Sequence, residues 1–342
     1  MREGDDRRRV LVVGVGSIGE RHVRCFLSTG RVELSVCDVD ESLARAVCER
    51  HHIDTRHASL DDAISSDIDA AVICTPAHLH VPMATRLADR GVDLLIEKPL
   101  STSLDGVDEL EAGCARHGVR AAVAYVWRAH PVLAHLRDAI VSRRFGRPLE
   151  LVVHSGQHFP TYRPAYREIY YRDHATGGGA IQDALTHLVN IGEWLVGPVT
   201  RVAADAARLR LEGVDVEDTV HAIARHGEVM ASYSLNQHQA PNETTLTVVC
   251  EDGTCRFEHA TGAWSSSTTP GQPWRVELEQ LPGRDELFVR QAEGFLDRLR
   301  DDAPPLCTVD EAAQTLRVTL AMLRSVERQC GFVRLDDTST TN

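Results

Sequence analysis

The fold is decided by residues 10–19, which read Val-Leu-Val-Val-Gly-Val-Gly-Ser-Ile-Gly. The apolar run predicts a buried strand, and the glycines after it have the G-x-G-x-x-G spacing of a dinucleotide-binding turn. The first glycine permits the tight turn, the second lets the backbone approach a pyrophosphate, and the third lets the next helix pack closely on the strand. We expect the cofactor phosphates at the N-terminus of that helix. The residues expected to contact them are Gly14, Gly16, Ser17, Ile18 and Gly19.

An acidic residue follows at the distance that a dinucleotide site requires. Asp38 comes directly after the strand-like run 34–37 and lies 19 residues beyond Gly19. Its carboxylate would bind the ribose hydroxyls and repel a 2′-phosphate, which favours NAD over NADP. A plainer interpretation is a glycine turn with an ordinary surface aspartate. Because strand, turn, helix and acid coincide, we interpret this segment as a NAD site.

The first third of the chain alternates strand-like and helical patterns. The strand-like runs are 10–13, 34–37, 70–74, 94–96 and 120–124, and a helical pattern lies between successive runs. This alternation predicts a doubly wound parallel sheet with right-handed crossovers, the Rossmann fold. We expect this cofactor domain to span residues 1–125.

The pattern changes after about Tyr125. Helices are expected at 131–144, 181–195, 285–300 and 309–330. Strands are expected at 149–154, 199–211, 218–225, 229–235, 245–250 and 255–258, with a loop at 264–274. Turns such as His226-Gly227 separate the later strands, which predicts antiparallel hairpins. We expect a second domain of α+β class at 126–335, and a disordered polar tail at 336–342.

Lys98 is the only lysine among 37 basic residues. Its ammonium group is compact and can shift its pKa when desolvated, whereas the arginine guanidinium is a planar fork that stays charged. Lys98 follows the apolar run 92–96, where a buried strand would end, and ligands of open parallel sheets bind at the carboxyl ends of strands. The alternative is one surface lysine left by coding bias. Residue type and position together favour a functional role.

The composition limits the classes of function. The formal net charge of −13 disfavours a nucleic-acid or anionic-membrane surface as the main partner. No apolar run reaches the roughly 18 residues of a membrane span. Nine cysteines are scattered without CxxC pairs, which favours free thiols in a reducing cytoplasm and argues against a zinc site. We expect a cytoplasmic protein with no resident metal.

Taken together, these motifs resemble the glucose–fructose oxidoreductase / inositol dehydrogenase (Gfo/Idh/MocA) family. The resemblance covers nearly the whole chain. It rests on the order of Gly14–Gly19 with His22, Thr75-Pro76 with His80, Glu97-Lys98-Pro99, Gly177-Gly178-Gly179, Asp183-x-x-x-His187 and Trp194-Leu195-x-Gly197. It implies an N-terminal Rossmann domain and a C-terminal domain with an open, largely antiparallel sheet that often forms oligomer contacts. The catalytic residues that it implies are Lys98, Asp183 and His187.

Further residues are expected beside the cofactor, and two positions depart from the family pattern. The additional cofactor residues are Thr75, Pro76, His80 and Glu97, of which His80 is as well explained by a structural role. The family usually has glycine where this chain has Leu185, and often has aspartate where this chain has Asn190. Leu185 would crowd the helix against its neighbour or narrow the substrate space. Neither change removes a chemical group from the catalytic set.

The three implied catalytic residues suit the oxidation of a secondary alcohol, in which a hydride leaves carbon and a proton leaves oxygen. Asp183 and His187 are four residues apart and would share one face of a helix. Histidine titrates near neutral pH and suits a general base, while the aspartate would orient its ring or bind a neighbouring hydroxyl. Lys98 would stabilise the developing alkoxide or relay the proton. The alternatives are a core histidine, or a metal site for which further ligands are not evident.

A basic and aromatic loop, 158–172, precedes the expected catalytic helix. It holds four of the six tyrosines of the chain and three arginines. Aromatic faces beside guanidinium groups suit a sugar ring, a carboxylate or a phosphate, but tyrosine and arginine are also enriched at subunit contacts. The residues that the substrate interpretation names are Tyr162, Arg163, Tyr166 and Arg167, together with Arg128 as a further anion contact.

We expect NAD-dependent oxidation, or the reverse reduction, of a secondary hydroxyl on a cyclic polyol, sugar or sugar derivative. A phosphorylated or nucleotide-linked sugar is left open. Two alternatives remain, a NAD-dependent glycosidase that acts through transient oxidation and a non-catalytic NAD-sensing regulatory protein. An exposed face on the late sheet, residues 245–258, predicts a homodimer or homotetramer.

Overall fold

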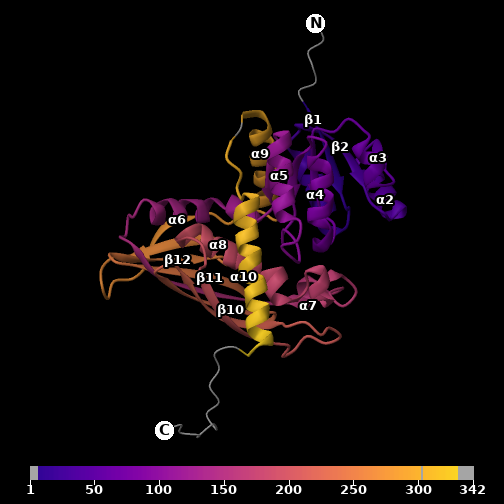
Figure 1. Ribbon diagram of the computed structural model, residues 1–342. Coiled ribbons are helices and arrows are strands. Elements are labelled where there is room, and N and C mark those ends of the chain that lie inside the picture. Colours follow the sequence, from indigo (N-terminus) through magenta and orange to yellow (C-terminus); the bar gives the residue numbers. More distant parts are fainter. Residues whose placement is uncertain (1–6, 302, 330–342) are drawn as a thin grey trace.

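The computed structural model describes residues 7–301 and 303–329, which form two sheet-containing parts (Figure 1). The first part holds a six-stranded sheet in which every neighbouring pair of strands is parallel. Its order is β3-β2-β1-β4-β5-β6, with β1 at Arg8–Val13, β2 at Val32–Cys37, β3 at Thr55–His57, β4 at Ala70–Ile73, β5 at Asp93–Ile96 and β6 at Ala121–Val123. The expected Rossmann sheet is confirmed.

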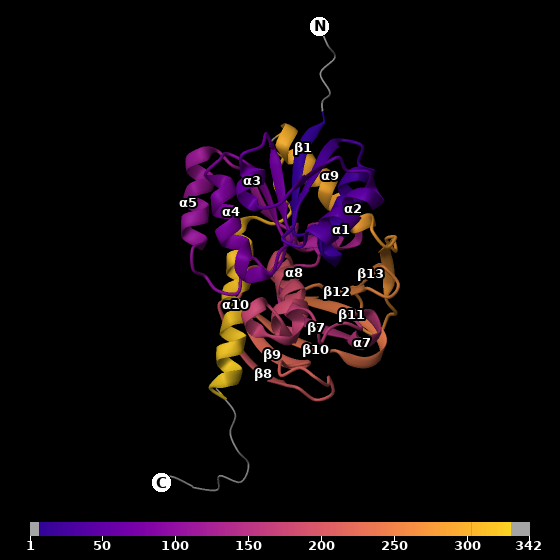
Figure 2. The same cartoon turned by 90° about the vertical axis from the view of Figure 1, so that its right-hand side faces the viewer.

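Helices cover both faces of this parallel sheet (Figure 2). One face packs against α3 (Leu60–Ile64), α4 (His80–Ala88) and α5 (Val107–His117). The other packs against α1 (Ser17–Ser28), α2 (Glu41–His51) and α9 (Glu286–Asp301). Helix α9 comes from near the end of the chain, so the late sequence completes a layer of the N-terminal part. The first part is therefore not built from one continuous segment of the chain. The domain boundary expected at residue 125 stays a prediction.

The second part holds an eight-stranded sheet with the order β14-β13-β12-β11-β7-β10-β9-β8. Its strands are β7 Pro148–His158, β8 Arg201–Ala207, β9 Thr219–His226, β10 Val229–Asn236, β11 His238–Cys250, β12 Gly253–Glu258, β13 Ala263–Ser267 and β14 Arg275–Glu279. All neighbours are antiparallel except β7 and β10, which are parallel. The expected largely antiparallel sheet is confirmed.

Three helices pack on one face of the second sheet: α6 (Pro131–Val141), α8 (Thr186–Val196) and α10 (Val309–Glu327). Their apolar side chains join those of the strands in one core. Helix α10 runs from the first part along the second, as Figure 1 shows. Its N-terminus is fixed by a capping box between Thr308 and Glu311. No helix among residues 7–301 and 303–329 is both long and apolar enough to span a membrane.

Several elements differ from the sequence-based expectations. Trp264 was expected in a loop, but it lies in β13 with its ring fully buried, and its indole N–H donates to His135 of α6. The strand expected at 199–211 ends at Ala207, because Asp218 accepts the backbone N–H groups of residues 209–211 and holds them in a loop. The elements β3, α3 and β14 were not predicted. The tail at 336–342 lies outside the described residues.

Candidate active site

The glycine turn after β1 has the geometry that a dinucleotide needs. Gly14 has a φ of +82°, and a Cβ there would lie 3.0 Å from the Cys74 carbonyl. A Cβ at Gly19 would lie 1.9 Å from the Gly14 oxygen, so only glycine lets α1 pack against the turn. A Cβ at Gly16 would meet nothing within 4 Å. The backbone at Gly16, the N-cap of α1, is therefore open on the side where a pyrophosphate can approach.

Asp38 is fixed beside this turn by two backbone groups. Its Oδ2 accepts the N–H of Val15 at 2.7 Å, and its Oδ1 accepts the N–H of Asp40 at 2.9 Å. The carboxylate thus lies at the end of β2, where an acid can reach the ribose hydroxyls of a bound dinucleotide. This arrangement fits NAD. The preference for NAD over NADP stays a prediction.

Glu97, which was expected beside the cofactor, lies in a buried hydrogen-bond network after β5. Its Oε1 is 2.7 Å from Nε2 of the buried His22 on α1, and its Oε2 accepts the N–H of Lys98 at 3.0 Å. Burial alone would raise the pKa of Glu97, but the His22 hydrogen bond and the charges of His22 and Lys98 hold that pKa below its ordinary value. Glu97 thus holds the backbone of Lys98, and its contact with the cofactor stays a prediction.

His80 joins the two loops that follow β4 and β5. Its ring nitrogens lie 2.7 Å from the Thr75 oxygen and 2.9 Å from the Pro99 oxygen. Burial lowers the pKa of this imidazole. A neutral ring carries one N–H, so it donates to one of these carbonyl oxygens at a time. His80 therefore has a structural role, and it holds Thr75-Pro76 against the turn that carries Lys98.

Lys98 and Asp183 meet across the two parts of the chain. Lys98 Nζ donates to Asp183 Oδ1 at 3.0 Å and to the Asp183 carbonyl oxygen at 2.9 Å. The two side chains are only 16% and 13% exposed. Burial would raise the pKa of Asp183, but the Lys98 charge and its hydrogen bond hold that pKa below the ordinary value. Asp183 is therefore an anion at neutral pH, paired with the only lysine.

The helix that carries Asp183 is not the α-helix that the sequence predicted. Residues Ala180–Leu185 form a π-helix, and α8 begins at Thr186. The wider turn is held at its start by Glu217, whose side chain accepts the Ile181 N–H at 2.8 Å and whose carbonyl accepts the Ala180 N–H at 3.0 Å. The α-helical geometry expected for Asp183 and His187 is therefore corrected.

His187 lies in the first turn of α8, edge-on to the ring of Tyr125 at 5.9 Å between centroids. Its Nδ1 is buried and has no hydrogen-bond partner among the described residues. Burial, followed by the Lys98 charge, lowers the pKa of His187 to about 3. The imidazole is therefore uncharged at neutral pH. The hydrogen bonds described for the Asp183 carboxylate go to Lys98 and Tyr170, so they do not support a role in orienting the His187 ring.

Tyr170 belongs to this cluster and was not among the predicted site residues. Its hydroxyl donates to Asp183 Oδ1 at 2.9 Å, the same oxygen that Lys98 contacts. The Asp183 charge, together with the hydrogen bond to Asp183, raises the pKa of Tyr170 well above its ordinary value, so the phenol keeps its proton. The 158–172 loop indicated the region. Four tyrosines in an irregular segment gave no pattern that could select this one.

Three of the five residues expected to bind substrate are engaged elsewhere. Tyr166 is buried and its hydroxyl donates to the Glu212 oxygen, as does Nε of Arg167. Arg128 is 3% exposed, pairs with Glu311 at 2.7 Å and donates to Asn190 at 2.7 Å. The contacts of Tyr166 and Arg167 join the 158–172 loop to Glu212. The contacts of Arg128 link α8 to α10. The burial of Tyr166 and Arg128 argues against a substrate role for these two, whereas Tyr162, Arg163 and Arg167 have exposed side chains and keep theirs as a prediction.

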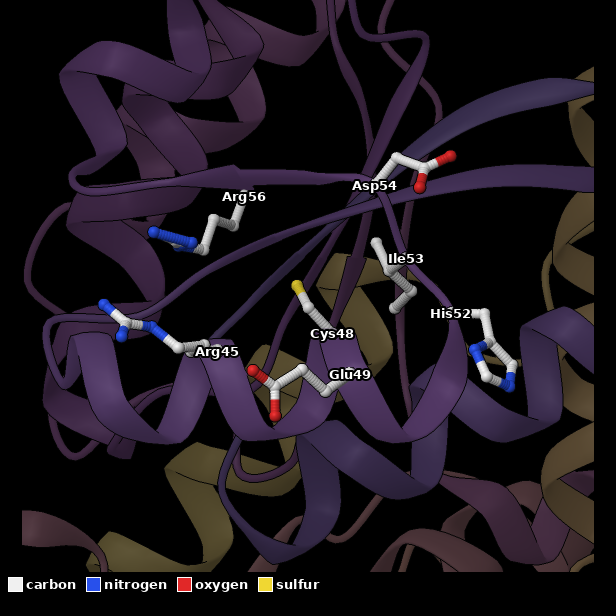
Figure 3. Close-up of a pocket in the computed structure, with 7 residues that line it drawn as sticks. All are labelled: Arg45, Cys48, Glu49, His52, Ile53, Asp54 and Arg56. Carbon is white, nitrogen blue, oxygen red and sulfur yellow. The ribbon is translucent and has the colours of Figure 1, made fainter.

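A cavity of about 210 Å³ adjoins the catalytic set on the side of the second sheet. Its lining residues are Trp127, Ser155, Gln157, Ala184, His187, Leu188, Leu235, Asn236, Gln237, Asn242, Thr244 and His259. The sequence did not single these residues out, apart from His187, because they come from separate strands. A larger depression of about 450 Å³ lies around α2 (Figure 3) and contains none of the catalytic residues.

Two family models match this chain in sequence. Residues 8–125 match "Oxidoreductase family, NAD-binding Rossmann fold", and residues 133–256 match "GFO/IDH/MocA C-terminal domain". The chain belongs to the Gfo/Idh/MocA oxidoreductase family. The resemblance inferred from the motifs is confirmed.

Individual relatives agree with this assignment. The chain is 28% identical to the rhizopine catabolism protein MocA of Rhizobium meliloti, over 91% of this chain and 95% of the relative. The solved WlbA dehydrogenase from Bordetella pertussis, in complex with NADH and UDP-GlcNAcA, is 26% identical with a TM-score of 0.79, covering 94% and 97% of the two chains. Levoglucosan dehydrogenase, solved with NADH and levoglucosan, shares the fold at a TM-score of 0.85 and 19% identity, covering 94% and 98%.

Proposed function

We propose that this protein is a NAD-dependent dehydrogenase that oxidises a secondary hydroxyl of a cyclic polyol, sugar or sugar derivative, or reduces the ketone in reverse. The observation that carries the proposal is the 3.0 Å contact between Lys98 Nζ and Asp183 Oδ1. It joins the carboxyl end of a Rossmann strand to the helix that carries His187. This edge of the sheet is where dinucleotide enzymes hold their ligands.

The residues of the turn fit NAD, with an open backbone at Gly16 and an oriented carboxylate at Asp38. Bound NAD would supply the hydride acceptor. The protein's own groups must then bind the alcohol, hold its oxygen and remove its proton.

Lys98 is suited to stabilise the oxygen that becomes a ketone. Its ammonium is held at two points by Asp183, so its position is defined before substrate arrives. As the C–H bond breaks with its electron pair, negative charge moves toward the oxygen, and a fixed donor there lowers the barrier. Asp183 keeps its charge and balances that of Lys98.

His187 is suited to take the hydroxyl proton. Its pKa of about 3 keeps the ring uncharged, so it presents an acceptor nitrogen throughout the neutral range. The same low pKa makes His187 a weak base before reaction, because burial and, after it, the Lys98 charge oppose protonation. Negative charge that develops on the substrate oxygen offsets the Lys98 charge. The proton affinity of His187 then rises as the reaction proceeds.

The relatives support the class of substrate, because solved members carry NADH together with levoglucosan or UDP-GlcNAcA. The test is to incubate purified protein with NAD and a panel of inositols, monosaccharides and nucleotide sugars, and to follow NADH absorbance. We expect at least one hydroxylated ring to give NADH in proportion to substrate, and Lys98→Met to slow NADH formation by about 10²–10⁴-fold. Glycoside cleavage without NADH, or NAD binding without any conversion, would contradict the proposal.

A further inference from the structure

The cavity beside His187 is walled by the second sheet and lies beyond the reacting groups. Its lining comes from β7, β10 and β11, from the first turn of α8, and from Trp127, whose indole stacks on His259 at 5.3 Å between ring centroids. Because His187 is one of its lining residues, a substrate whose hydroxyl meets His187 can place its remaining atoms in this space.

The lining of this cavity holds no arginine, lysine, aspartate or glutamate among the described residues. The polar side chains are four carboxamides, two hydroxyls and two imidazoles: Gln157, Asn236, Gln237, Asn242, Ser155, Thr244, His187 and His259. A carboxamide both donates and accepts hydrogen bonds, as a sugar hydroxyl does. A phosphate or carboxylate only accepts, and its burial without a counter-charge is costly.

Besides His187 Nδ1, two further lining side chains hold polar atoms that the described residues do not satisfy. Nε2 of the fully buried Gln237 and Nδ1 of His259 have no partner among the described residues. Buried polar groups in proteins are almost always hydrogen-bonded. The other end of Gln237 is occupied, because its Oε1 accepts the Tyr171 hydroxyl. These two nitrogens therefore have no hydrogen-bond acceptor among the described residues.

The arginines near the site do not supply a counter-charge to the cavity. Arg128 pairs with Glu311, and none of Arg128, Arg163 and Arg167 is part of the lining. The charge of Lys98 is already balanced by Asp183. The cavity is also smaller than the roughly 300 Å³ at which pockets for larger ligands begin. Its volume of about 210 Å³ suits one ring.

From this chemistry we infer that the substrate is an uncharged single-ring polyol or monosaccharide, and that Gln157 and Asn242 help to select it through its distal hydroxyls. The inference rests on the proposed function and narrows it. Gln157 lies on β7 and Asn242 on β11, and neither side chain has a hydrogen bond described within residues 7–301 and 303–329. Both are therefore available to a ligand.

The first test compares neutral and anionic forms of the same ring. With NAD present, kcat/KM is measured for myo-inositol, D-glucose and D-xylose against inositol 1-phosphate, glucose 6-phosphate and UDP-glucose. We expect kcat/KM for the best neutral probe to be at least about tenfold higher than kcat/KM for the best anionic probe. A factor of this size is what well-formed hydrogen bonds contribute. An anionic probe that is equal or better overturns the inference and leaves the dehydrogenase proposal intact.

The second test uses a matched pair of substitutions. Gln157→Leu should raise KM for the best neutral probe about tenfold while leaving NAD affinity and melting temperature nearly unchanged. Gln272→Leu is the same change at an exposed loop position, and it should leave both KM and NAD affinity unchanged. If Gln157→Leu destabilises the protein, Asn242→Leu at the exposed end of the lining replaces it. An unchanged KM in both lining variants overturns the role of these residues.

Binding separates this inference from the proposed function. If no probe yields NADH, calorimetric titration of the protein–NAD mixture with the same six probes still reports selectivity. Neutral rings that bind more tightly than their phosphorylated forms support the inference even though the dehydrogenase proposal has failed. Binding only by anionic probes, or by none of the six, overturns it.

Discussion

Asp183 Oδ1 is the atom on which the catalytic residues converge, since Lys98 approaches it at 3.0 Å and Tyr170 at 2.9 Å. Lys98→Met removes the donor to the reacting oxygen, so turnover should fall by about 10²–10⁴-fold. Lys98→Arg should rescue poorly, because a planar fork cannot make both contacts to Asp183 from the same point. Initial rates of NADH formation and fluorescence titration with NAD measure the two effects. Near wild-type turnover in Lys98→Arg would show that the assignment is wrong.

The Tyr170 hydroxyl stabilises the anionic form of Asp183. Tyr170→Phe removes that hydrogen bond and should lower kcat/KM about tenfold, as expected for a bond to a charged group. Because the bond lowers the pKa of Asp183, its loss should raise that pKa and move the acidic limb of the pH–rate profile to higher pH. Tyr166→Phe is the matched control, since its hydroxyl contacts only the Glu212 carbonyl. A profile that coincides with that of the wild type would argue against this role.

The choice of cofactor depends on the charge at Asp38. A carboxylate repels a 2′-phosphate, so kcat/KM should be higher with NAD than with NADP. Asp38→Asn keeps the shape of the side chain and removes its charge. It should therefore bring kcat/KM with NADP closer to kcat/KM with NAD. Asp38→Ala should have the same effect, and also frees the Val15 N–H that the carboxylate now binds. The ratio of the two kcat/KM values decides the matter, and equal efficiency in the wild type would refute the prediction.

At the scale of elements, the π-helix that presents Asp183 depends on Glu217. This carboxylate accepts the Ile181 N–H at 2.8 Å and lies 2.5 Å from Nε2 of His174. The Glu217 hydrogen bond raises the pKa of His174, so its stabilising contribution is complete below the unfolded pKa of about 6.5. That stabilising contribution is lost as the pH rises through the pKa of His174 in the folded protein, which is higher than its pKa in the unfolded chain.

Glu217→Gln should therefore lower the melting temperature more at pH 6 than at pH 8.5, and should lower kcat because the π-helix loosens. Melting curves of both proteins at the two pH values measure the difference. His174→Gln should remove the same pH dependence while keeping the Ile181 contact. An equal loss of melting temperature at both pH values would exclude the His174–Glu217 pair as its cause.

The elements also show how far the sequence reaches. The Gly14–Gly19 turn, the parallel strands and the placement of Lys98 follow from local patterns, because strand, turn and helix signals lie within a few residues of one another. Tyr170 and the cavity lining depend on which strands become neighbours, which periodicity does not report. The π-helix depends on Glu217, more than 30 residues from the segment that it holds. Trp264 was assigned to a loop because its serine neighbours carry little strand signal.

At the scale of the whole molecule, the end of the chain packs into both parts through α9 and α10. Phe295 of α9 lies edge-on to Phe26 of α1, and Glu311 of α10 pairs with the buried Arg128. The Lys98 turn of the first part meets the helix that carries Asp183 through the two hydrogen bonds of Lys98 Nζ to Asp183. The catalytic cluster is therefore a consequence of how the parts pack, and no single part contains it.

The face of the second sheet opposite α6, α8 and α10 remains open in the single chain. Its register aligns Ile223 with Ser232 and Ser232 with Val152, so these side chains share one face, and Met230 follows on the same face two residues before Ser232. Ile223 is 68% exposed and Met230 is 56% exposed. Adjacent exposed apolar side chains on a sheet are typical of a surface that another protein covers.

We therefore predict a homodimer or homotetramer that forms through this face. Light scattering at micromolar concentration should give a mass that is a multiple of one chain, and Ile223→Asp with Met230→Asp should convert it to monomer by placing charges in the buried interface. Val141→Asp changes an equally exposed apolar residue at the end of α6, on the helical side, and should leave the mass unchanged. A monomeric wild type, or an oligomer that survives both substitutions on the sheet, would place the interface elsewhere.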